Sequence, residues 1–379
     1  MMPRASLRKL LLVAALLAVS WPATKMLRRW SEIHSPEVFK VDFALYYATA
    51  LQGRTMGWNT LYDLEAQRTA FRRVSTDLFL FPTTNTPQMA LLIAPLTRLP
   101  LDTAYQLWSL LLLASLGMCA ALMAPGGPGA RLLQGAMVLV PYPSVLALQL
   151  GQVIALQMAA LAISFALLRR GRETAAGLAL LPLVLKPQGL VLVPFALLAA
   201  GRRRAFVSFA LATLVLGAVV VAVVGLEGAR SYLERIGYAA SHPHEFWVSY
   251  SYTLTMHFST VAGRTLMQVT AVALALVAAW RHREHPEIGI AAAILASLLA
   301  SPYLHLPDLM LLFPAAWLVL RVLPAPWTAL YLLGTYVFLL LCTHDYTHVA
   351  ARWVLLLEVI WLAALPVLPR GLVGAQEPA

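Results

Sequence analysis

The chain is a succession of apolar stretches, many of them long enough to cross a bilayer, joined by short connections that carry arginine. A membrane-spanning helix needs about 20 apolar residues, because each residue adds 1.5 Å. With 60% hydrophobic residues, 12% charged residues and a mean hydropathy of +0.74, the 379 residues carry more apolar surface than one soluble core can bury. We therefore expect an all-α, multi-pass membrane protein in which residues 1–379 form one domain.

Twelve segments fit that length, several of them only when tilted. They are residues 8–24, 101–124, 132–149, 151–168, 173–186, 188–201, 205–225, 264–280, 287–302, 308–321, 327–343 and 350–367. The pattern predicts about 10 to 12 transmembrane helices. The pair on either side of Lys186-Pro187-Gln188 is too short for two upright spans, so it is expected to be tilted, to lie in thinned bilayer, or to form a re-entrant pair sheltered by its neighbours.

The apolar stretch of the first segment, Leu10 to Trp21, follows Arg4, Arg8 and Lys9, as the apolar part of a signal peptide does. It is followed by a basic run, residues 25–29, instead of small residues typical of a cleavage site. We interpret it as a retained first helix.

The basic residues predict the orientation of the chain. With a cytoplasmic N-terminus, the basic connections fall on the cytoplasmic side, as the positive-inside rule requires. They are Arg131, Arg169 to Arg172, Arg202 to Arg204, Arg281 to Arg283, Arg321 and Arg370. The run at 25–29 is the exception and is expected to meet lipid phosphates, unless the first helix is shifted. Because the net charge of +11 resides in these connections, it does not indicate nucleic-acid binding.

Most unusual polar residues map to the opposite face, which is therefore where we expect a reaction centre. They are Asp42, Asp63, Asn85, Gln152, Lys186, Gln188, His242, His244, His305, Asp308, His344, Asp345 and His348. The first outer loop, residues 25–100, has amphipathic patches at 43–51 and 63–74 and an apolar run at 89–96, which predict short interfacial helices. A second outer loop, 226–263, is rich in Tyr, Trp and His, which suit both a membrane interface and sugar stacking.

Several short motifs occur in a recognisable order. They are Asp42-Phe43-x-x-Tyr46-Tyr47, Gly53 with Leu61-Tyr62, Leu150-Gly151-Gln152, Lys186-Pro187-Gln188 and Ser301-Pro302-Tyr303-x-His305-x-x-Asp308. Over residues 35 to 320 this order resembles glycosyltransferase family 87, whose members have the GT-C fold and include polyprenyl-phosphate-mannose-dependent α-mannosyltransferases. The chain departs from the family where an aromatic residue and proline are expected and Thr84-Asn85-Thr86-Pro87 stands instead. The departure concerns the shape of a substrate pocket.

The resemblance implies an inverting transfer of a sugar, mannose by analogy, from a polyprenyl-phosphate donor to a lipid-linked or cell-envelope acceptor at the non-cytoplasmic face of the cell membrane. Asp42 is the predicted base, because a carboxylate beside the attacking hydroxyl can take its proton. A phosphate leaving group needs little protonation, so one carboxylate can suffice. The alternative for Asp42 is a helix cap. Asp63 and Asp77 compete for its role but lie in more polar surroundings.

Lys186 lies between apolar runs, where an unpaired charge costs on the order of 3 kcal/mol. We expect Lys186 and His305 to bind the donor phosphate, with Asp308 orienting the imidazole or capping the next helix. The alternative for His305 is an interfacial histidine bound to water. Substrate binding is assigned to Tyr46, Tyr47, Gln152, Gln188, Tyr303 and Asp308, although both glutamines also suit interhelical hydrogen bonds.

We expect neither a metal nor another cofactor. Cys119 and Cys342 lie in apolar runs without metal-ligand spacing. His344-Asp345-x-x-His348 could hold a metal on one helical face but lies beyond the region of resemblance. No glycine fingerprint of a nucleotide-sugar domain is present. The main rival function is a transporter or flippase, which would form a polar path at the membrane midplane instead of a cluster at one face. A second rival is a lipid-dependent phosphoryl transferase.

Overall fold

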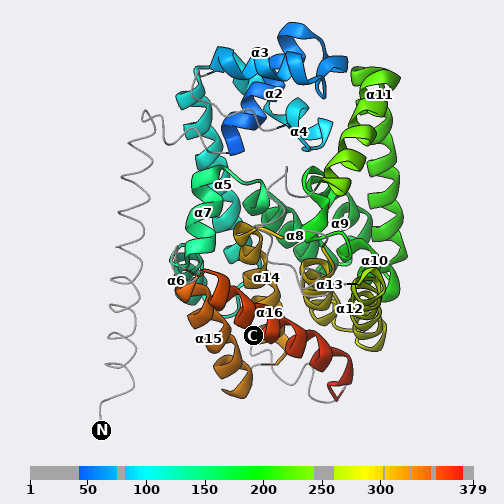
Figure 1. Cartoon of the computed structure of the whole chain (residues 1–379). Helices are drawn as coiled ribbons and strands as arrows, with labels where there is room; N and C mark the ends of the chain where they lie inside the picture. The colour runs from blue at the N-terminus through cyan, green and yellow to red at the C-terminus, as the bar shows by residue number, and fades with distance from the viewer. Residues whose placement is uncertain are drawn as a thin grey trace.

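The structure is a computed structural model that describes residues 42–74, 82–242, 260–301, 304–323, 326–342 and 347–369. All regular elements within these ranges are helical. The N-terminal elements are α2 (Asp42–Met56), η2 (Trp58–Thr60), α3 (Leu64–Val74), α4 (Pro87–Ile93) and η3 (Ala94–Arg98). They form a head at one end of the molecule (Figure 1).

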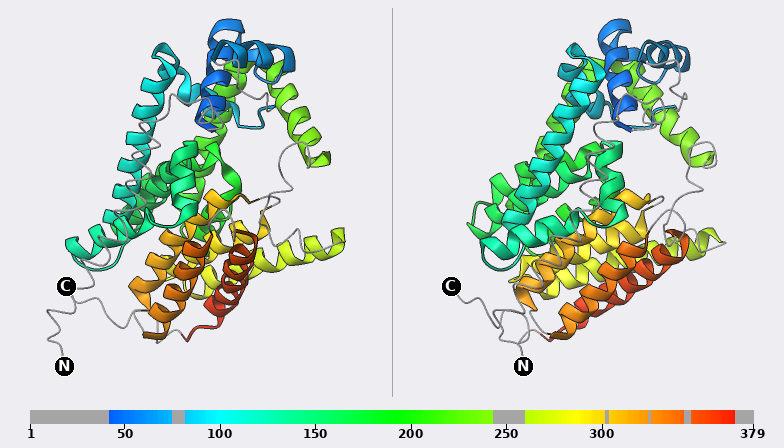
Figure 2. Two further views of the ribbon diagram at one scale, coloured as in Figure 1. Left: turned by 60° about the vertical axis from the view of Figure 1, so that its left-hand side comes forward. Right: turned by 90° about the vertical axis from the view of Figure 1, so that its left-hand side faces the viewer.

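The central elements are α5 (Leu101–Met123), α6 (Pro128–Val138), α7 (Tyr142–Leu150), α8 (Ile154–Arg169), α9 (Glu173–Ala179), η4 (Leu181–Leu185), η5 (Pro187–Gly189), α10 (Val193–Ala199) and α11 (Arg203–Ser241). The C-terminal elements are α12 (Val261–Arg281), α13 (Pro286–Ala300), η9 (Leu306–Leu311), α14 (Leu312–Val322), α15 (Pro326–Leu341), α16 (Thr347–Ala364) and η10 (Leu365–Val367). Figure 1 shows α5 and α11 on two sides of the molecule, and Figure 2 shows the C-terminal helices packed below.

The expectation of an all-α membrane protein is confirmed. Four helices are long and apolar enough to cross a membrane, namely α5, α11, α12 and the segment Val349–Val367. A fifth span results if α6 and α7 are one broken crossing. Exposed leucines such as Leu107, Leu110 and Leu214 lie on α5 and α11, as expected for surfaces that face lipid.

The number of full-length spans is smaller than expected because several predicted segments are short or broken. The predicted span 132–149 is two helices, α6 and α7, bent by 76°. Pro141 and Pro143 lack a backbone N–H donor and lie at the bend, where one helix ends and the next begins. The segments 151–168, 287–302, 308–321 and 327–343 correspond to helices shorter than 18 residues.

The prediction that residues 173–201 do not form two upright spans is confirmed. This region consists of α9 and α10 joined by the short 3₁₀ helices η4 and η5, with Lys186 between them. Pro182, Pro187 and Pro194 interrupt its backbone hydrogen bonding.

The prediction of an outer loop at 226–263 is wrong for the first part of that range, because residues 226–241 belong to helix α11. The predicted span 205–225 ends where the helix breaks, since Gly225 has non-helical angles of φ 75° and ψ 166°. The helix continues from there to Ser241 and packs against the head, where Gly228 lies against the backbone of Asn59 and Tyr232 against Tyr62.

Helix α3 has the predicted amphipathic character, with Ala66, Gln67, Ala70 and Phe71 buried. Helix α2 does not lie on a surface as an amphipathic helix would, because α3, α4, η3 and α5 cover it and most of its residues are buried. Pro87–Ile93 is helical, as the apolar run predicted.

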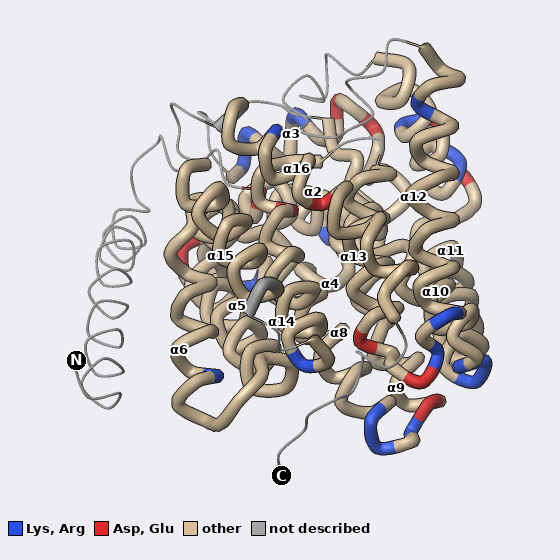
Figure 3. The backbone as a smooth tube through the Cα atoms, turned by 90° about the horizontal axis from the view of Figure 1, so that it is seen from below, with Lys and Arg blue, Asp and Glu red and all other residues tan. Residues whose placement is uncertain are grey.

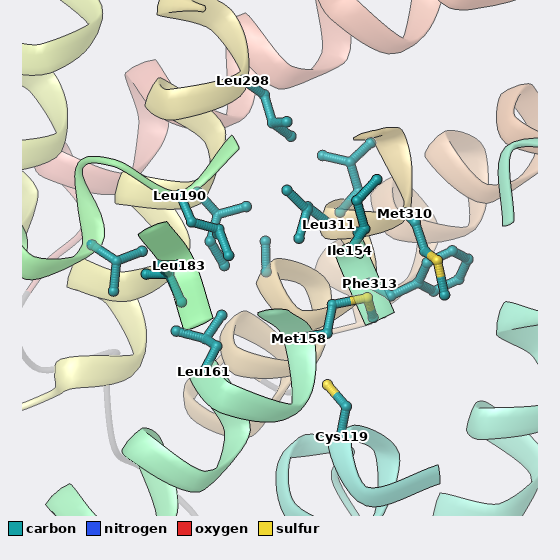
Figure 4. Packing of buried hydrophobic residues seen from close by; sticks show 14 of the residues in the cluster. Cys119, Ile154, Met158, Leu161, Leu183, Leu190, Leu298, Met310, Leu311 and Phe313 are labelled. Carbon is teal, nitrogen blue, oxygen red and sulfur yellow. The ribbon is translucent and has the colours of Figure 1, made fainter. Parts of the chain in front are cut away.

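The core of the membrane region lies below the head. Figure 4 shows residues of this buried cluster, which come from several elements: Cys119 of α5, Met158 and Leu161 of α8, Leu183 of η4, Leu298 of α13 and Met310 of η9. Helices α12 and α13 approach closely through small residues, since a Cβ at Gly289 would lie 3.0 Å from that of Ala279. This packing fixes the broken segments that carry the polar residues described next.

Candidate active site

Five of the predicted site residues form one chain of hydrogen bonds. Gln152 donates from Nε2 to Asp42 Oδ2, and its Oε1 accepts from Lys186 Nζ at 3.1 Å. Lys186 Nζ also lies 2.5 Å from Asp308 Oδ1, and Asp308 Oδ2 accepts the backbone N–H of His305 at 2.9 Å. The bonded side chains lie 110, 34 and 122 residues apart in the sequence, for Asp42 and Gln152, Gln152 and Lys186, and Lys186 and Asp308.

The turn after α7 places Gln152 beside Asp42. Gly151 ends α7 in the left-handed region, with φ 72° and ψ 31°, and a Cβ there would lie 2.8 Å from Cβ of Phe43. Trp108 stacks on Phe43 and donates from Nε1 to the Gly151 carbonyl at 2.8 Å. A bulkier residue at 151 would push the glutamine away from the carboxylate.

The break between η4 and η5 places Lys186. Its backbone carbonyl accepts a hydrogen bond from Gln157 Nε2 at 2.9 Å, and Gln157 also donates to Leu183 at 3.2 Å. Gly189, in η5, packs against Leu311 so closely that a Cβ would lie 2.7 Å from that side chain. The 3₁₀ helices therefore aim the ammonium at η9, which carries Asp308.

The accessible groups of the network are at its two ends. Asp308 and Gln152 are buried, whereas Asp42 and His305 are partly exposed. The side chain of Lys186 is 14% exposed, so the ammonium is near the surface of the site. An ammonium has three N–H donors, and the two hydrogen bonds above leave room for a third acceptor.

Burial raises the pKa of Asp42 to about 6, and the negative charge of Asp308 acts in the same direction. Lys186 and the hydrogen bond from Gln152 oppose that rise. Asp42 belongs to α2, outside the candidate spans, and at pH 7 it is mostly ionised. Burial lowers the pKa of His305, with Asp308 opposing and Lys186 reinforcing the shift, so the imidazole is neutral at pH 7.

The remaining predicted residues lie elsewhere or outside the described residues. Tyr46 and Tyr47 are buried in α2, and the Tyr47 hydroxyl donates to the Leu99 carbonyl at 2.8 Å. Gln188 is partly exposed in η5, two residues from Lys186. Asp63 is exposed and caps α3, since its Oδ1 accepts the N–H of Ala66 at 2.7 Å.

Tyr303, Asp77, His344 and Asp345 lie outside the described residues, as does the side chain of His348. Within the described ranges, no group of three or more His, Cys, Asp or Glu side chains converges as a metal site would.

Two contacts in the site were not predicted. Gln157, a polar residue inside an apolar stretch, holds the Lys186 segment, and its polarity was the available signal. The unusual loop Thr84-Asn85-Thr86-Pro87 lies against the same segment, because the Thr86 hydroxyl donates to the Leu185 carbonyl at 3.3 Å. The loop that departs from the family pattern therefore borders the site.

The sequence model of glycosyltransferase family 87 matches residues 84–302, more than half of the chain. The match contains Gln152 and Lys186, whereas Asp42, His305 and Asp308 lie outside it. No curated protein and no solved structure matches the chain. The chain therefore belongs to glycosyltransferase family 87 and is a multi-pass membrane glycosyltransferase, an enzyme that moves a sugar from a donor to an acceptor.

Proposed function

We propose that the enzyme transfers a sugar, mannose by family analogy, from a polyprenyl-phosphate donor to a lipid-linked or cell-envelope acceptor with inversion. One observation carries the proposal. The carboxylate of Asp42 and the ammonium of Lys186 are held at the two ends of the same Gln152 amide. The carboxylate can accept the proton of an acceptor hydroxyl, and the ammonium can bind a donor phosphate.

Asp42 acts as the general base in this proposal. Its carboxylate is ionised at neutral pH yet more basic than an ordinary aspartate, because its pKa is raised to about 6. As the acceptor oxygen bonds to the anomeric carbon, the bond from that carbon to the phosphate oxygen breaks and the electron pair leaves with the phosphate. The hydroxyl proton passes to Asp42.

Lys186 and His305 contact the donor phosphate in this proposal. The third N–H of the Lys186 ammonium is directed to a phosphate oxygen, while Asp308 keeps the ammonium in place through the 2.5 Å contact. His305 contributes a hydrogen bond from a neutral ring, since its pKa is lowered by burial. An added phosphate charge raises the pKa of Asp42 further, which makes the base stronger when donor is bound.

The carboxylates of the network favour a single displacement. A double displacement uses one carboxylate as nucleophile and a second acid/base group to activate the acceptor. Asp308 is buried, and its two oxygens are engaged by Lys186 and by the His305 backbone, so Asp42 is the accessible carboxylate of the network. With one accessible carboxylate, attack by the acceptor inverts the anomeric centre.

We place the reaction on the non-cytoplasmic face of the cell membrane. Arg131 and Arg321 donate to the carbonyls of Ala121 and Met123 at the C-terminal end of α5, far from the head. Arg202 pairs with Glu173 at 3.2 Å, which brings two further basic connections together. The positive-inside rule assigns these ends to the cytoplasm and the opposite end, with the head, to the outside.

The test is a transfer assay with the purified protein in lipid vesicles. Polyprenyl-phosphate mannose, polyprenyl-phosphate glucose and a nucleotide-linked mannose are offered separately, each with an extract of membrane lipids as acceptor. We expect a mannosylated lipid product with inverted anomeric configuration from the first donor. Transfer from the nucleotide sugar alone would refute the lipid-donor assignment, and donor translocation without transfer would favour the flippase.

A further inference from the structure

Three exposed arginines lie on neighbouring segments at the edge of the head. Arg54 lies in the last turn of α2 and donates to Thr97 Oγ1 at 2.6 Å. Arg98 is the next residue after Thr97, and Arg73 of α3 donates to Thr55 Oγ1, next to Arg54, at 3.4 Å. These contacts gather residues of α2, α3 and η3, which we call the arginine cluster (Arg54, Arg73 and Arg98).

The arginine cluster includes a residue close to the start of a candidate membrane span. Arg98 is three residues before Leu101, where the candidate span α5 begins, and the exposed side chains of Leu107 and Leu110 follow on that span. Since a helix rises 1.5 Å per residue, Arg98 lies within roughly one turn of the start of this span, and lipid headgroups are expected at the ends of a span. Figure 3 shows basic segments next to α3 at this edge of the molecule.

Within the described part of the chain, the ion pairs do not include any residue of the arginine cluster. They join Arg68 to Glu65, Lys186 to Asp308, Arg202 to Glu173 and Arg230 to Glu234. Asp63, the other carboxylate near the start of α3, caps that helix. Two of the three positive charges are thus held by threonine hydroxyls, and the third belongs to the residue next to Thr97.

We propose that the arginine cluster binds the phosphate of an anionic phospholipid of the surrounding bilayer. Guanidinium groups suit this ligand because they form paired hydrogen bonds to phosphate oxygens. The donor's own phosphate is excluded by distance. Arg54 is 12 residues after Asp42 on the same helix, or about 18 Å along its axis, whereas the donor phosphate must lie beside the reacting sugar.

The test measures lipid retention by the purified, full-length protein in detergent, with native mass spectrometry and equal amounts of phosphatidylglycerol and phosphatidylcholine. We expect the wild type to retain phosphatidylglycerol preferentially. Each arginine near a lipid surface contributes about five-fold in affinity, so Arg54→Gln/Arg73→Gln/Arg98→Gln should lose on the order of 100-fold. The control, Arg68→Gln/Arg230→Gln, removes positive charge from other exposed positions of α3 and α11 and should keep the preference.

A lysine variant shows whether a loss of lipid binding comes from the missing positive charge or from a folding defect caused by substitution at these positions. Arg54→Lys/Arg73→Lys/Arg98→Lys loses the planar donors but keeps three positive charges, so it should keep most of the preference. If the glutamine variant retains the preference, or if the control loses it equally, the proposal is wrong. Displacement of phosphatidylglycerol by millimolar inorganic phosphate would assign the cluster to a soluble phosphate and would also overturn it. None of these readouts requires sugar transfer, so they remain informative if the proposed reaction fails.

Discussion

Removing the charge of Lys186 should affect both stability and donor binding, and a second substitution can separate the two effects. The ammonium and the Asp308 carboxylate lie 2.5 Å apart, with side chains 14% and 3% exposed. Lys186→Met keeps most of the apolar stem but leaves Asp308 as a buried carboxylate without its cation. Breaking such a pair by removing one partner costs about 3–5 kcal/mol of folding free energy.

The double variant Lys186→Met/Asp308→Asn removes the stranded charge. The amide oxygen introduced at position 308 can still accept the backbone N–H of His305, so the double variant should recover most of the lost stability. It should not recover donor affinity, because the phosphate still lacks the ammonium. Charge-assisted hydrogen bonds contribute about 1.5–3 kcal/mol, so donor should bind roughly 10 to 150-fold more weakly.

Two measurements on the same preparations test this reasoning. Thermal unfolding in detergent reports stability, and equilibrium binding of polyprenyl-phosphate mannose reports donor affinity. Asp308→Asn alone serves as the control, since it keeps the ammonium and its hydrogen bond to Gln152. Recovery of both stability and wild-type donor affinity in the double variant would show that Lys186 has only a structural role.

The same geometry makes three further predictions. Because Asp42 must be ionised to act as base and its pKa is about 6, kcat/KM should rise with pH and reach half its plateau near that value; a rate that is flat or falls over roughly pH 5 to 8 would contradict this. Gly151→Ala should lower the rate of transfer at least about ten-fold, since the new Cβ would lie 2.8 Å from Cβ of Phe43. The control, Gly171→Ala, has a similar φ of 70° and open space around it, so it should lose only about 1 kcal/mol of stability. Equal effects of the two substitutions on transfer would refute the role of Gly151 in placing Gln152. In intact cells an impermeant thiol reagent should label Ser241→Cys but not Arg203→Cys, which lie at opposite ends of α11, and the reverse pattern would invert the proposed orientation.

The apolar runs predicted long spans better than bends. Residues 101–124 and 264–280 correspond to α5 and α12, because a run of about 20 apolar residues has one favourable outcome in a bilayer. The bend between α6 and α7 depends on what packs around Pro141, and the helix beyond Gly225 depends on the head against which it packs. Neither condition can be deduced from local sequence.

The site was predicted as a set of residues but not as a set of contacts. The sequence placed Asp42, Gln152, Lys186, His305 and Asp308 on one face of the membrane, and the structure joins them in one network. It did not predict that Asp308 pairs with Lys186, because 122 residues separate the two and a single sequence contains no information on which distant polar residues meet. The pairing changes the interpretation of Lys186, whose charge is stabilised by a carboxylate even without donor.

The central claim is that the Asp42 carboxylate takes the proton of the acceptor. Its most direct test is single-turnover sugar transfer by Asp42→Asn with polyprenyl-phosphate mannose, at donor and acceptor concentrations that saturate the wild type. The amide keeps the shape of the side chain but cannot serve as base, so we predict that the rate falls by about 10² to 10⁴-fold while donor binding and thermal stability are retained. A rate above about a tenth of the wild-type value would contradict the assignment of Asp42 as the base.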